Sequence, residues 1–351
     1  MDGSFPNSPG ERQRVLVDLG LAAGLDRVGV ASAEPFEDVR RVLAERKAAG
    51  LHGGLTFTFN NPERSSDVRT SLPWARSLVV GGSAYLPVAG SPGDAVPGTG
   101  RIARFAVDDS YRPLRAALGR LADTLSAAGH RAEIVSDDNR LVDRAAAVRA
   151  GLGWWGKNTM VLAPGEGPWM LFGSVVTDAD IEPTRPMRRD CGTCEACLPA
   201  CPTGALVAPG VLDARLCLAA IAQREGSVPE TLRQAMGDRV YGCDDCLDAC
   251  PPGHRLAGST EQRRGRVGLV ALLEASDAEL LHEFGRFYLP RRRPDVLRRN
   301  ALVALGNTGD SSSLDAVGRY VDHPDPVLAE HARWAYTRIE ARAGGGGRRL
   351  P

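Results

Sequence analysis

The deciding stretch of the sequence reads Cys191-Gly-Thr-Cys194-Glu-Ala-Cys197-Leu-Pro-Ala-Cys201-Pro202. Its spacing, C-x2-C-x2-C-x3-C-P, is the run that holds cubane [4Fe–4S] clusters in bacterial two-cluster ferredoxins. The run returns incompletely at Cys243-Asp-Asp-Cys246-Leu-Asp-Ala-Cys250-Pro251, where one early cysteine is missing. Cys217 lies alone between the two runs and can supply the eighth ligand.

These eight cysteines predict two [4Fe–4S] clusters. In two-cluster ferredoxins the fourth cysteine of each run ligates the other cluster, which sets the clusters side by side for electron transfer. On that logic the first set of ligands is Cys191, Cys194, Cys197 and Cys250. The second set is Cys201, Cys217, Cys243 and Cys246. Two zinc sites are the alternative, although zinc usually takes separate C-x2-C pairs.

The composition indicates an ordinary globular protein. The chain has 351 residues, is 43% hydrophobic, and balances 43 basic against 43 acidic residues. The beginning of the chain lacks the apolar core of a secretory signal, and no apolar run is long enough to span a membrane. We therefore expect a cytoplasmic monomer whose thiols stay reduced, which disfavours disulfides.

Four regions follow along the chain. Residues 1–184 alternate helical and strand patterns and predict an α/β domain. Residues 185–255 form the ferredoxin-type cysteine module. Residues 264–342 predict an all-α domain of short helix pairs resembling HEAT repeats, with a plain helical bundle as the alternative. Residues 343–351, rich in glycine, predict a disordered tail.

Within the first region the expected helices cover 11–23, 35–49, 111–128 and 141–150. The expected strands begin at Val28, Ser77 and Ala132. Residues 160–162 and 169–176 suggest two further strands that pair with each other.

A glycine-rich stretch, Gly151-Leu-Gly153-Trp-Trp-Gly156, fits the spacing of a dinucleotide-binding loop. That loop requires a strand before it and a helix after it, whereas here a helix precedes and a strand follows. The stretch is therefore either a tight turn or a loop whose backbone lies against a flat cofactor.

Asp137 and Asp138 follow the strand that begins at Ala132. Carboxylates at a strand end often face a cleft in which chemistry occurs. The alternative is that Asp138, or both residues, cap the helix that follows.

A basic segment covers residues 285–299, which hold one acidic residue, Asp295, and six arginines: Arg286, Arg291, Arg292, Arg293, Arg298 and Arg299. These side chains either form a solvated face and cap helix ends, or contact a phosphate backbone.

The whole chain, from about Asn61 to Ile339, resembles the epoxyqueuosine reductase family. The resemblance is carried by Arg64, Leu72-Pro-Trp-Ala-Arg-Ser-Leu-Val, Arg104-Phe-Ala, Tyr111, the block Ala150-Gly-Leu-Gly-Trp-Trp-Gly-Lys-Asn-Thr159, Cys201-Pro-Thr-Gly-Ala, Asp238-Arg-Val-Tyr-Gly-Cys-Asp-Asp-Cys246, Arg299-Asn-Ala-Leu-Val-Ala-Leu-Gly-Asn and His331-Ala-Arg-Trp-Ala. Four places depart from the family's usual residues, namely Arg112, Asp138-Asn-Arg140, Ala219-Ala220 and Pro252. They indicate a divergent subgroup.

The resemblance implies an oxidoreductase that reduces the epoxide of epoxyqueuosine to queuosine in the anticodon stem-loop of tRNA. It implies a base-off cobalamin over the α/β domain, fed by the two clusters, which an external donor such as flavodoxin or ferredoxin would reduce. It implies Asp137 as the general acid beside the cobalamin, with Arg64, Lys157, Asn158 and Thr159 as further cofactor contacts. The candidate RNA contacts are Arg291, Arg292, Arg293, Arg298 and Arg299.

Two other functions stay open from the sequence. One is a cobalamin-dependent reductase of a small molecule, which would not need the arginine-rich helical region. The other is a non-enzymatic iron–sulfur electron carrier, which would not need the large first domain.

Overall fold

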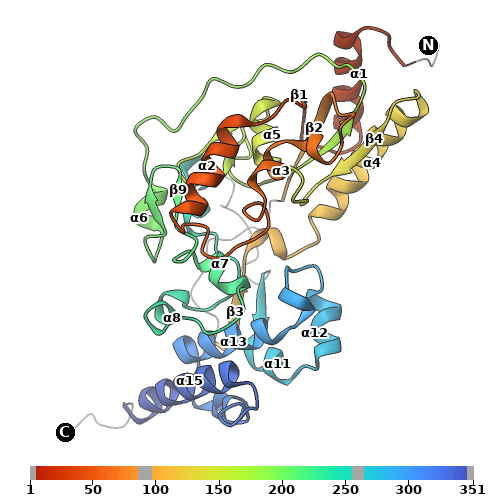
Figure 1. The fold of residues 1–351 in the computed structure, drawn as a ribbon. Coiled ribbons are helices and arrows are strands. Elements are labelled where there is room, and N and C mark those ends of the chain that lie inside the picture. Colours follow the sequence, from red (N-terminus) through yellow and green to blue (C-terminus); the bar gives the residue numbers. More distant parts are fainter. Residues whose placement is uncertain (1–4, 86–96, 255–264, 346–351) are drawn as a thin grey trace.

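The computed structural model describes residues 5–85, 97–254 and 265–345. Figure 1 shows the first domain at the top, the cysteine module at the left and centre, and the C-terminal helices at the bottom. The mixture of helices and strands that the sequence predicts is confirmed.

The first domain is built on a four-stranded sheet in the order β1-β2-β7-β4, in which all neighbours are antiparallel. Its strands are β1 (Arg27–Ser32), β2 (Ser77–Ala84), β4 (Ala132–Val135) and β7 (Met170–Thr177). The surrounding elements are α1 (Pro9–Ala22), α2 (Glu37–Ala48), α3 (Pro62–Ser66), η1 (Val68–Thr70), η2 (Arg104–Ala106), α4 (Tyr111–Ala127) and α5 (Asp143–Arg149).

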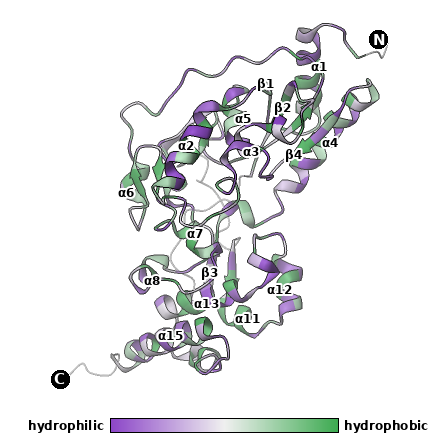
Figure 2. Cartoon of the chain, in the orientation of Figure 1, coloured by the Kyte–Doolittle hydropathy of each residue, from purple (hydrophilic) through white to green (hydrophobic). Residues whose placement is uncertain are grey.

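The two faces of this sheet are buried by different helices. Successive strand residues point to opposite faces, so Val79 packs with α1 and α4 while Leu78 and Val80 pack with α2 and α5. The leucine stripe of α4 is fully buried, as its helical spacing predicts. Figure 2 shows hydrophilic and hydrophobic residues on opposite sides of such helices.

One predicted strand pairing is wrong. Residues 161–162 form β6 (Val161–Leu162), which pairs with β5 (Trp154–Trp155) and not with β7. β7 instead lies between β2 and β4 in the central sheet. The short turn at residues 163–168 closes on itself through a bridge between Ala163 and Gly167, so it does not continue the pairing into β7.

The cysteine module consists of short elements joined by turns. They are α6 (Cys197–Ala200), β8 (Leu206–Ala208), β9 (Val211–Leu212), α7 (Leu218–Gln223), α8 (Glu230–Met236), β10 (Arg239–Tyr241), α9 (Asp245–Asp248) and α10 (Pro251–His254).

A second sheet joins all three regions. β3 (Thr99–Ile102) leaves the first domain and pairs in parallel with β10 of the cysteine module and antiparallel with β11 (Arg266–Gly268). The sequence predicts that the C-terminal region is all-helical. This prediction is wrong at the start of the region, where the strand β11 precedes the helices. The sheet fixes the helical region against the module.

The C-terminal helices are α11 (Leu269–Glu274), α12 (Asp277–Phe284), η3 (Pro290–Arg292), α13 (Asp295–Thr308), η4 (Ser311–Ser313), α14 (Leu314–Gly318) and α15 (Pro326–Gly345). α13 is buried almost throughout, between α11 and α15. Asp310 and Asp325 precede η4 and α15, and their side chains accept backbone N–H groups of Ser312 and Val327. The HEAT-type interpretation stays a prediction. Residues 343–345 continue α15, so the tail predicted to be disordered is helical there, and residues 346–351 lie outside the described residues.

Among the described residues, no helix combines the length and apolar character that a membrane crossing requires.

Candidate functional site

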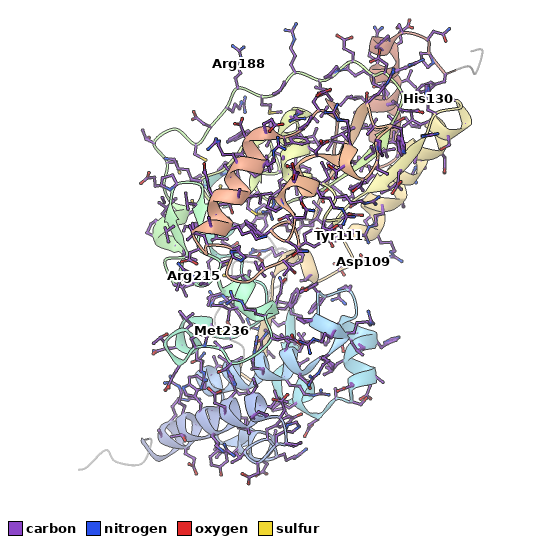
Figure 3. The ribbon with its side chains drawn as sticks, viewed as in Figure 1. Asp109, Tyr111, His130, Arg188, Arg215 and Met236 are labelled. Atoms are coloured by element: carbon purple, nitrogen blue, oxygen red, sulfur yellow. The ribbon has the colours of Figure 1, made fainter. Side chains whose placement is uncertain are left out.

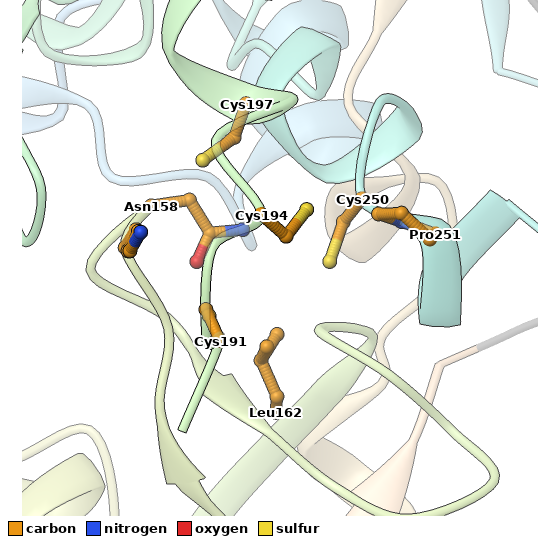
Figure 4. A pocket seen from close by; sticks show the side chains of 8 residues that line it. Asn158, Leu162, Cys191, Cys194, Cys197, Cys250 and Pro251 are labelled. Atoms are coloured by element: carbon orange, nitrogen blue, oxygen red, sulfur yellow. The ribbon is translucent and has the colours of Figure 1, made fainter.

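The four cysteines of the first predicted set surround one small hollow (Figure 4). Cys191 and Cys194 precede α6, Cys197 is the first residue of α6, and Cys250 comes from the junction of α9 and α10. Lys157, Asn158, Leu162 and Pro251 complete the lining. Cys197 and Cys250 are buried and Cys194 is exposed, so this hollow opens toward solvent on the Cys194 side.

The four cysteines of the second set are all half-buried. Burial raises the pKa of Cys243 to about 12, and the charges of Asp245 and Cys217 add to that rise. Burial likewise raises the pKa of Cys246, with further contributions from Cys243, Cys217, Cys201 and Cys197. The cysteines of the second set therefore affect one another, and Cys197 of the first set acts on Cys246 as well.

The donor chemistry fits iron–sulfur clusters. Both groups consist of thiols, the ligands that hold such clusters. Among residues 5–85, 97–254 and 265–345, no three His, Cys, Asp or Glu side chains meet as closely as a single metal ion requires. The first four thiols instead stand around an opening, which suits a cubane better than one zinc ion with sulfurs at about 2.3 Å.

Asp137 lies in the loop that follows β4 and presents its carboxyl to an open side of the protein. Its backbone is left-handed, with φ of 52°, a strained conformation for a residue with a side chain. Burial by the surrounding protein raises the pKa of this carboxyl, although the nearby Arg115 opposes the rise. A carboxyl of this kind retains its proton more readily than an ordinary aspartate.

Asp143, the first residue of α5, holds the Asp137 loop in place. Its Oδ2 accepts the backbone N–H of Asp137 at 2.9 Å. Its Oδ1 is buried and has no hydrogen-bond partner among the described residues. Burial raises the pKa of Asp143 well above its ordinary value, even though the hydrogen bond from Asp137 opposes this. Sequence reasoning missed Asp143; its position at the expected start of a helix was the available signal.

Three tyrosines lie around the carboxyls. Burial raises the pKa of Tyr111, and the charge of Asp137 adds to this rise. Burial also raises the pKa of Tyr85, and the charges of Asp244 and Tyr111 add to this rise. Burial raises the pKa of Tyr241 to about 12, again with a contribution from Asp137. The charges of Asp137 and of Asp244, which lies in the second cysteine run, thus both act on tyrosines of this group.

Asp138 does not cap the following helix, so that alternative is wrong for it. The N-cap residue of α5 is Val142, which makes no side-chain cap. The Asp138 carboxylate instead binds the Arg140 guanidinium, with Oδ2 2.7 Å from Nη2, and this hydrogen bonding lowers the pKa of Asp138. Arg140 also pairs with Glu133. Asp138 and Arg140, which depart from the family's usual sequence, thus form a local ion pair.

The other predicted cofactor contacts lie on two sides of the site. The Lys157 ammonium pairs with Glu195 at 3.3 Å, and the buried Asn158 donates to the carbonyl of Cys246 at 3.5 Å, so both adjoin the thiols. Thr159 has a left-handed backbone with φ of 66°. Arg64 donates to Ser71 Oγ at 3.1 Å and contributes to the lowered pKa of Asp138. It therefore lies on the Asp138 side.

The glycines of the 151–156 stretch pack against the protein itself. A Cβ at Gly151 would lie 2.4 Å from the carbonyl oxygen of Arg185, and one at Gly153 would lie 2.4 Å from that of Leu162. The tight-turn interpretation is therefore sufficient for these two glycines. The indole of Trp155, in contrast, is 44% exposed.

Two of the candidate RNA contacts are buried. Arg299 is 2% exposed and donates to the carbonyls of Ile221 and Gly226. Arg298 is 7% exposed and binds Asp277 at 2.6 Å. Because their guanidiniums are already paired inside the protein, a phosphate contact from either residue is excluded in this structure.

Three exposed arginines of the segment, Arg291, Arg292 and Arg293, lie in the turn η3 and directly after it. Arg286 is exposed as well, but its guanidinium donates to the carbonyls of Ala106 and Val107. Arg291 pairs with Glu225 at 3.0 Å and Arg293 with Asp295 at 2.6 Å. Arg291 and Arg292 both have left-handed backbones. An adjacent hollow is lined by Glu225, Gly226, Arg291, Arg293, Asp295, Val296, Arg299, Asp325, Val327 and Leu328.

Comparison with known proteins shows which family this chain is similar to. A family described as "4Fe-4S double cluster binding domain" matches residues 190–253. An epoxyqueuosine reductase of Bacillus cereus is 31% identical over 328 residues, covering 90% of this chain and 86% of that protein. The epoxyqueuosine reductase of Gloeobacter violaceus is 35% identical over 311 residues, covering 83% of this chain and 94% of its own.

Solved structures agree with this relationship. The selenomethionine-labelled epoxyqueuosine reductase superposes with a TM-score of 0.85 at 30% identity, covering 93% of this chain and 90% of its own. An epoxyqueuosine reductase with an epoxyqueuosine-modified tRNA-Tyr stem loop gives 0.83 at 29% identity, covering 93% and 89%. A Bacillus subtilis structure whose catalytic aspartate loop is swung out of the active site gives 0.83 at 30% identity, covering 93% and 90%. The chain contains two sets of thiols and an aspartate with a raised pKa, and it is similar to these reductases over nearly its whole length. It therefore belongs to the epoxyqueuosine reductase family of oxidoreductases.

Proposed function

We propose that this protein reduces the epoxide of epoxyqueuosine to queuosine in the anticodon stem-loop of tRNA, using two [4Fe–4S] clusters and a base-off cobalamin. The observation that carries the proposal is the similarity to epoxyqueuosine reductases over nearly the whole chain, one of them solved with a modified tRNA stem loop. The four thiols around one hollow and the raised pKa of Asp137 fit this activity.

In this proposal Asp137 supplies a proton. Removing the epoxide oxygen as water consumes electrons and protons, and an acid with a raised pKa holds a proton available near neutral pH. Asp143 orients the Asp137 loop through its hydrogen bond to the backbone. The swung-out aspartate loop of the Bacillus subtilis relative supports a loop of this kind having more than one position.

The residues beside Asp137 suit a cobalamin. Ser136 Oγ and Asp143 Oδ1 are buried polar atoms that find no partner in the part of the chain the structure describes, and the amide side chains of a corrin can pair with such atoms. Asp137, Arg64, Lys157, Asn158 and Thr159 would hold the cofactor. When bound, it would supply the low-valent cobalt that acts on the epoxide.

The clusters would carry electrons from an external donor such as flavodoxin or ferredoxin. The exposed turn Arg291–Arg293 would contact phosphates of the tRNA, because exposed guanidiniums bind phosphate oxygens well. The relative with a tRNA stem loop supports this class of substrate. We infer a monomer in solution, which light scattering can measure.

Anaerobic reconstitution tests the proposed cofactors. Protein loaded with iron and sulfide, and then with cobalamin, should hold about eight irons, by counting four for each cubane. It should also hold one cobalt per chain and show a base-off corrinoid spectrum. Stoichiometric zinc without iron, or cobalamin that elutes separately from the protein, would refute the cofactor assignment.

A further inference from the structure

Residues 178–190 lead from the end of β7 to Cys191 without helix or strand; we name residues 182–190 the strap. Figure 1 shows it running along the outside of the first domain toward α6. Its beginning is fixed, because the Glu182 and Thr184 N–H groups donate to the carbonyls of Pro9 and Val30 at 3.2 and 2.9 Å. Gly151 packs against its Arg185 carbonyl. The strap is therefore a positioned surface element.

The strap carries three exposed arginines, Arg185, Arg188 and Arg189. Within the described ranges of the chain, no carboxylate forms an ion pair with any of them. Arg189 lies over the Trp154 ring at 5.7 Å, and Figure 3 shows Arg188 pointing away from the protein. Of the nearby acids, Asp190 accepts the Gly192 N–H at 2.7 Å, Glu195 pairs with Lys157, and Glu182 lies at the other end of the strap.

This positive charge lies beside the thiols of the first set. Arg188 precedes Cys191 by three residues, and an extended chain of that length spans at most roughly 11 Å between Cα atoms. Cys194 is the exposed member of the eight cysteines. The four cysteines of the second set are half-buried. An electron arriving on the Cys194 side therefore meets the first set.

An exposed aromatic ring completes the surface. Trp155, 44% exposed, lies two residues before Lys157, which lines the hollow of the first set. Aromatic rings flanked by arginines are favoured at protein interfaces. Encounters between redox proteins use small contact areas, and complementary charge speeds their association.

We propose that the strap arginines and Trp155 form the docking surface for an acidic one-electron carrier protein that reduces the first cluster. The transfer is balanced: the carrier loses one electron, the cluster gains it, and no bond changes. This inference rests on the proposed function, because it requires both clusters to be present.

The test is the rate at which a carrier reduces the clusters, followed by their loss of visible absorbance under anaerobic conditions. The variant Arg185→Glu/Arg188→Glu/Arg189→Glu should accept electrons from reduced flavodoxin at low salt about tenfold or more slowly than the unaltered protein, since opposed charges remove electrostatic steering. The unaltered protein should slow as salt increases, and the variant should not. Trp155→Ala should weaken carrier binding without changing the salt dependence.

Two controls separate docking from damage. Dithionite should reduce the clusters of all variants equally, since it needs no docking surface. Arg41→Glu/Arg319→Glu/Arg333→Glu reverses three exposed arginines elsewhere and should behave as the unaltered protein. Cluster reduction is measured without tRNA or cobalamin. The docking result can therefore be interpreted even if the protein shows no turnover on tRNA.

An unchanged rate of reduction by flavodoxin in the strap variant would overturn the proposal. If the variant instead loses tRNA affinity at an unchanged reduction rate, the strap is an RNA surface and the carrier docks elsewhere.

Discussion

Asp137 and Asp138 are adjacent in the chain but differ in environment. The pKa of Asp137 is raised by burial, while that of Asp138 is lowered by its hydrogen bonds with Arg140. Asp137→Asn should therefore reduce turnover by about 10²-fold or more, the usual contribution of a general acid, with clusters and cobalamin retained. Asp138→Asn should have a much smaller effect. Product formation on modified tRNA measures both, and the opposite ranking would assign the acid to Asp138.

Asp143 should make stability depend on pH. Its folded-state pKa is raised, so the folded state favours the protonated carboxyl and loses stability as pH rises through that pKa. Asp143→Asn removes the ionisation and keeps an oxygen to accept the Asp137 N–H. The variant should melt at a higher temperature than the unaltered protein at pH 8, and the gain should shrink toward the unfolded-state pKa of about 3.9.

The exposed Asp123 provides the matched control for this change. Asp123→Asn should leave the melting temperature of the anaerobic, cluster-loaded protein nearly unchanged at both pH values. A gain from Asp143→Asn that is equally large at pH 4 and pH 8 would contradict the burial of an ionisable carboxyl at this position.

Sequence reasoning reached those residues whose role follows from spacing. The cysteine runs belong here, because ligand spacing is visible in the chain. The position of Asp137 and Asp138 after a strand is visible in the same way, but only the resemblance to the family implies that Asp137 is the general acid. Sequence reasoning could not reach Asp143, or separate the paired Asp138 from the free Asp137, because those roles depend on which groups meet in space. The burial of Arg298 and Arg299 could not be predicted for the same reason. An arginine-rich run is expected to be exposed unless the groups that pair with its guanidiniums are known.

At the scale of elements, the turn η3 carries the exposed part of the basic segment. Replacing Arg291, Arg292 and Arg293 by alanine should weaken tRNA binding and make its salt dependence shallower, as loss of phosphate contacts requires. Arg291 and Arg293 already have acidic partners, so Arg292, for which the described chain shows no acidic partner, should account for the largest single effect.

Affinity for the stem-loop measured at several salt concentrations provides the test. Arg41→Ala/Arg319→Ala/Arg333→Ala serves as the matched control and should leave the slope unchanged. An unaltered affinity and slope in the η3 variant would make the turn a solvated face.

Periodicity predicted the elements that are long and local. The buried leucine stripe of α4 and the starts of β2 and β4 are confirmed within a few residues. Pairing between strands was not predictable in the same way. β6 joins β5, and β3 crosses to β10 and β11, because these partners are chosen by long-range packing that a short apolar run does not specify.

At the scale of the whole molecule, the cysteine module connects the first domain to the helices. Cys217→Ala should damage the second cluster alone, since the first retains all four of its proposed ligands. Iron analysis and electron paramagnetic resonance of the reduced protein should show one cluster intact. Two intact clusters would show that the eighth ligand is not Cys217.

The central claim is that the acid, the clusters and the cobalamin act together on an epoxide in tRNA. Its most direct test is to incubate the reconstituted protein with cobalamin, a reductant and epoxyqueuosine-containing tRNA, and to analyse the nucleosides by mass spectrometry. The account predicts conversion to a nucleoside one oxygen atom lighter, dependent on both cofactors and lost in Asp137→Asn. Epoxyqueuosine that stays unchanged with fully loaded, reduced protein would contradict it.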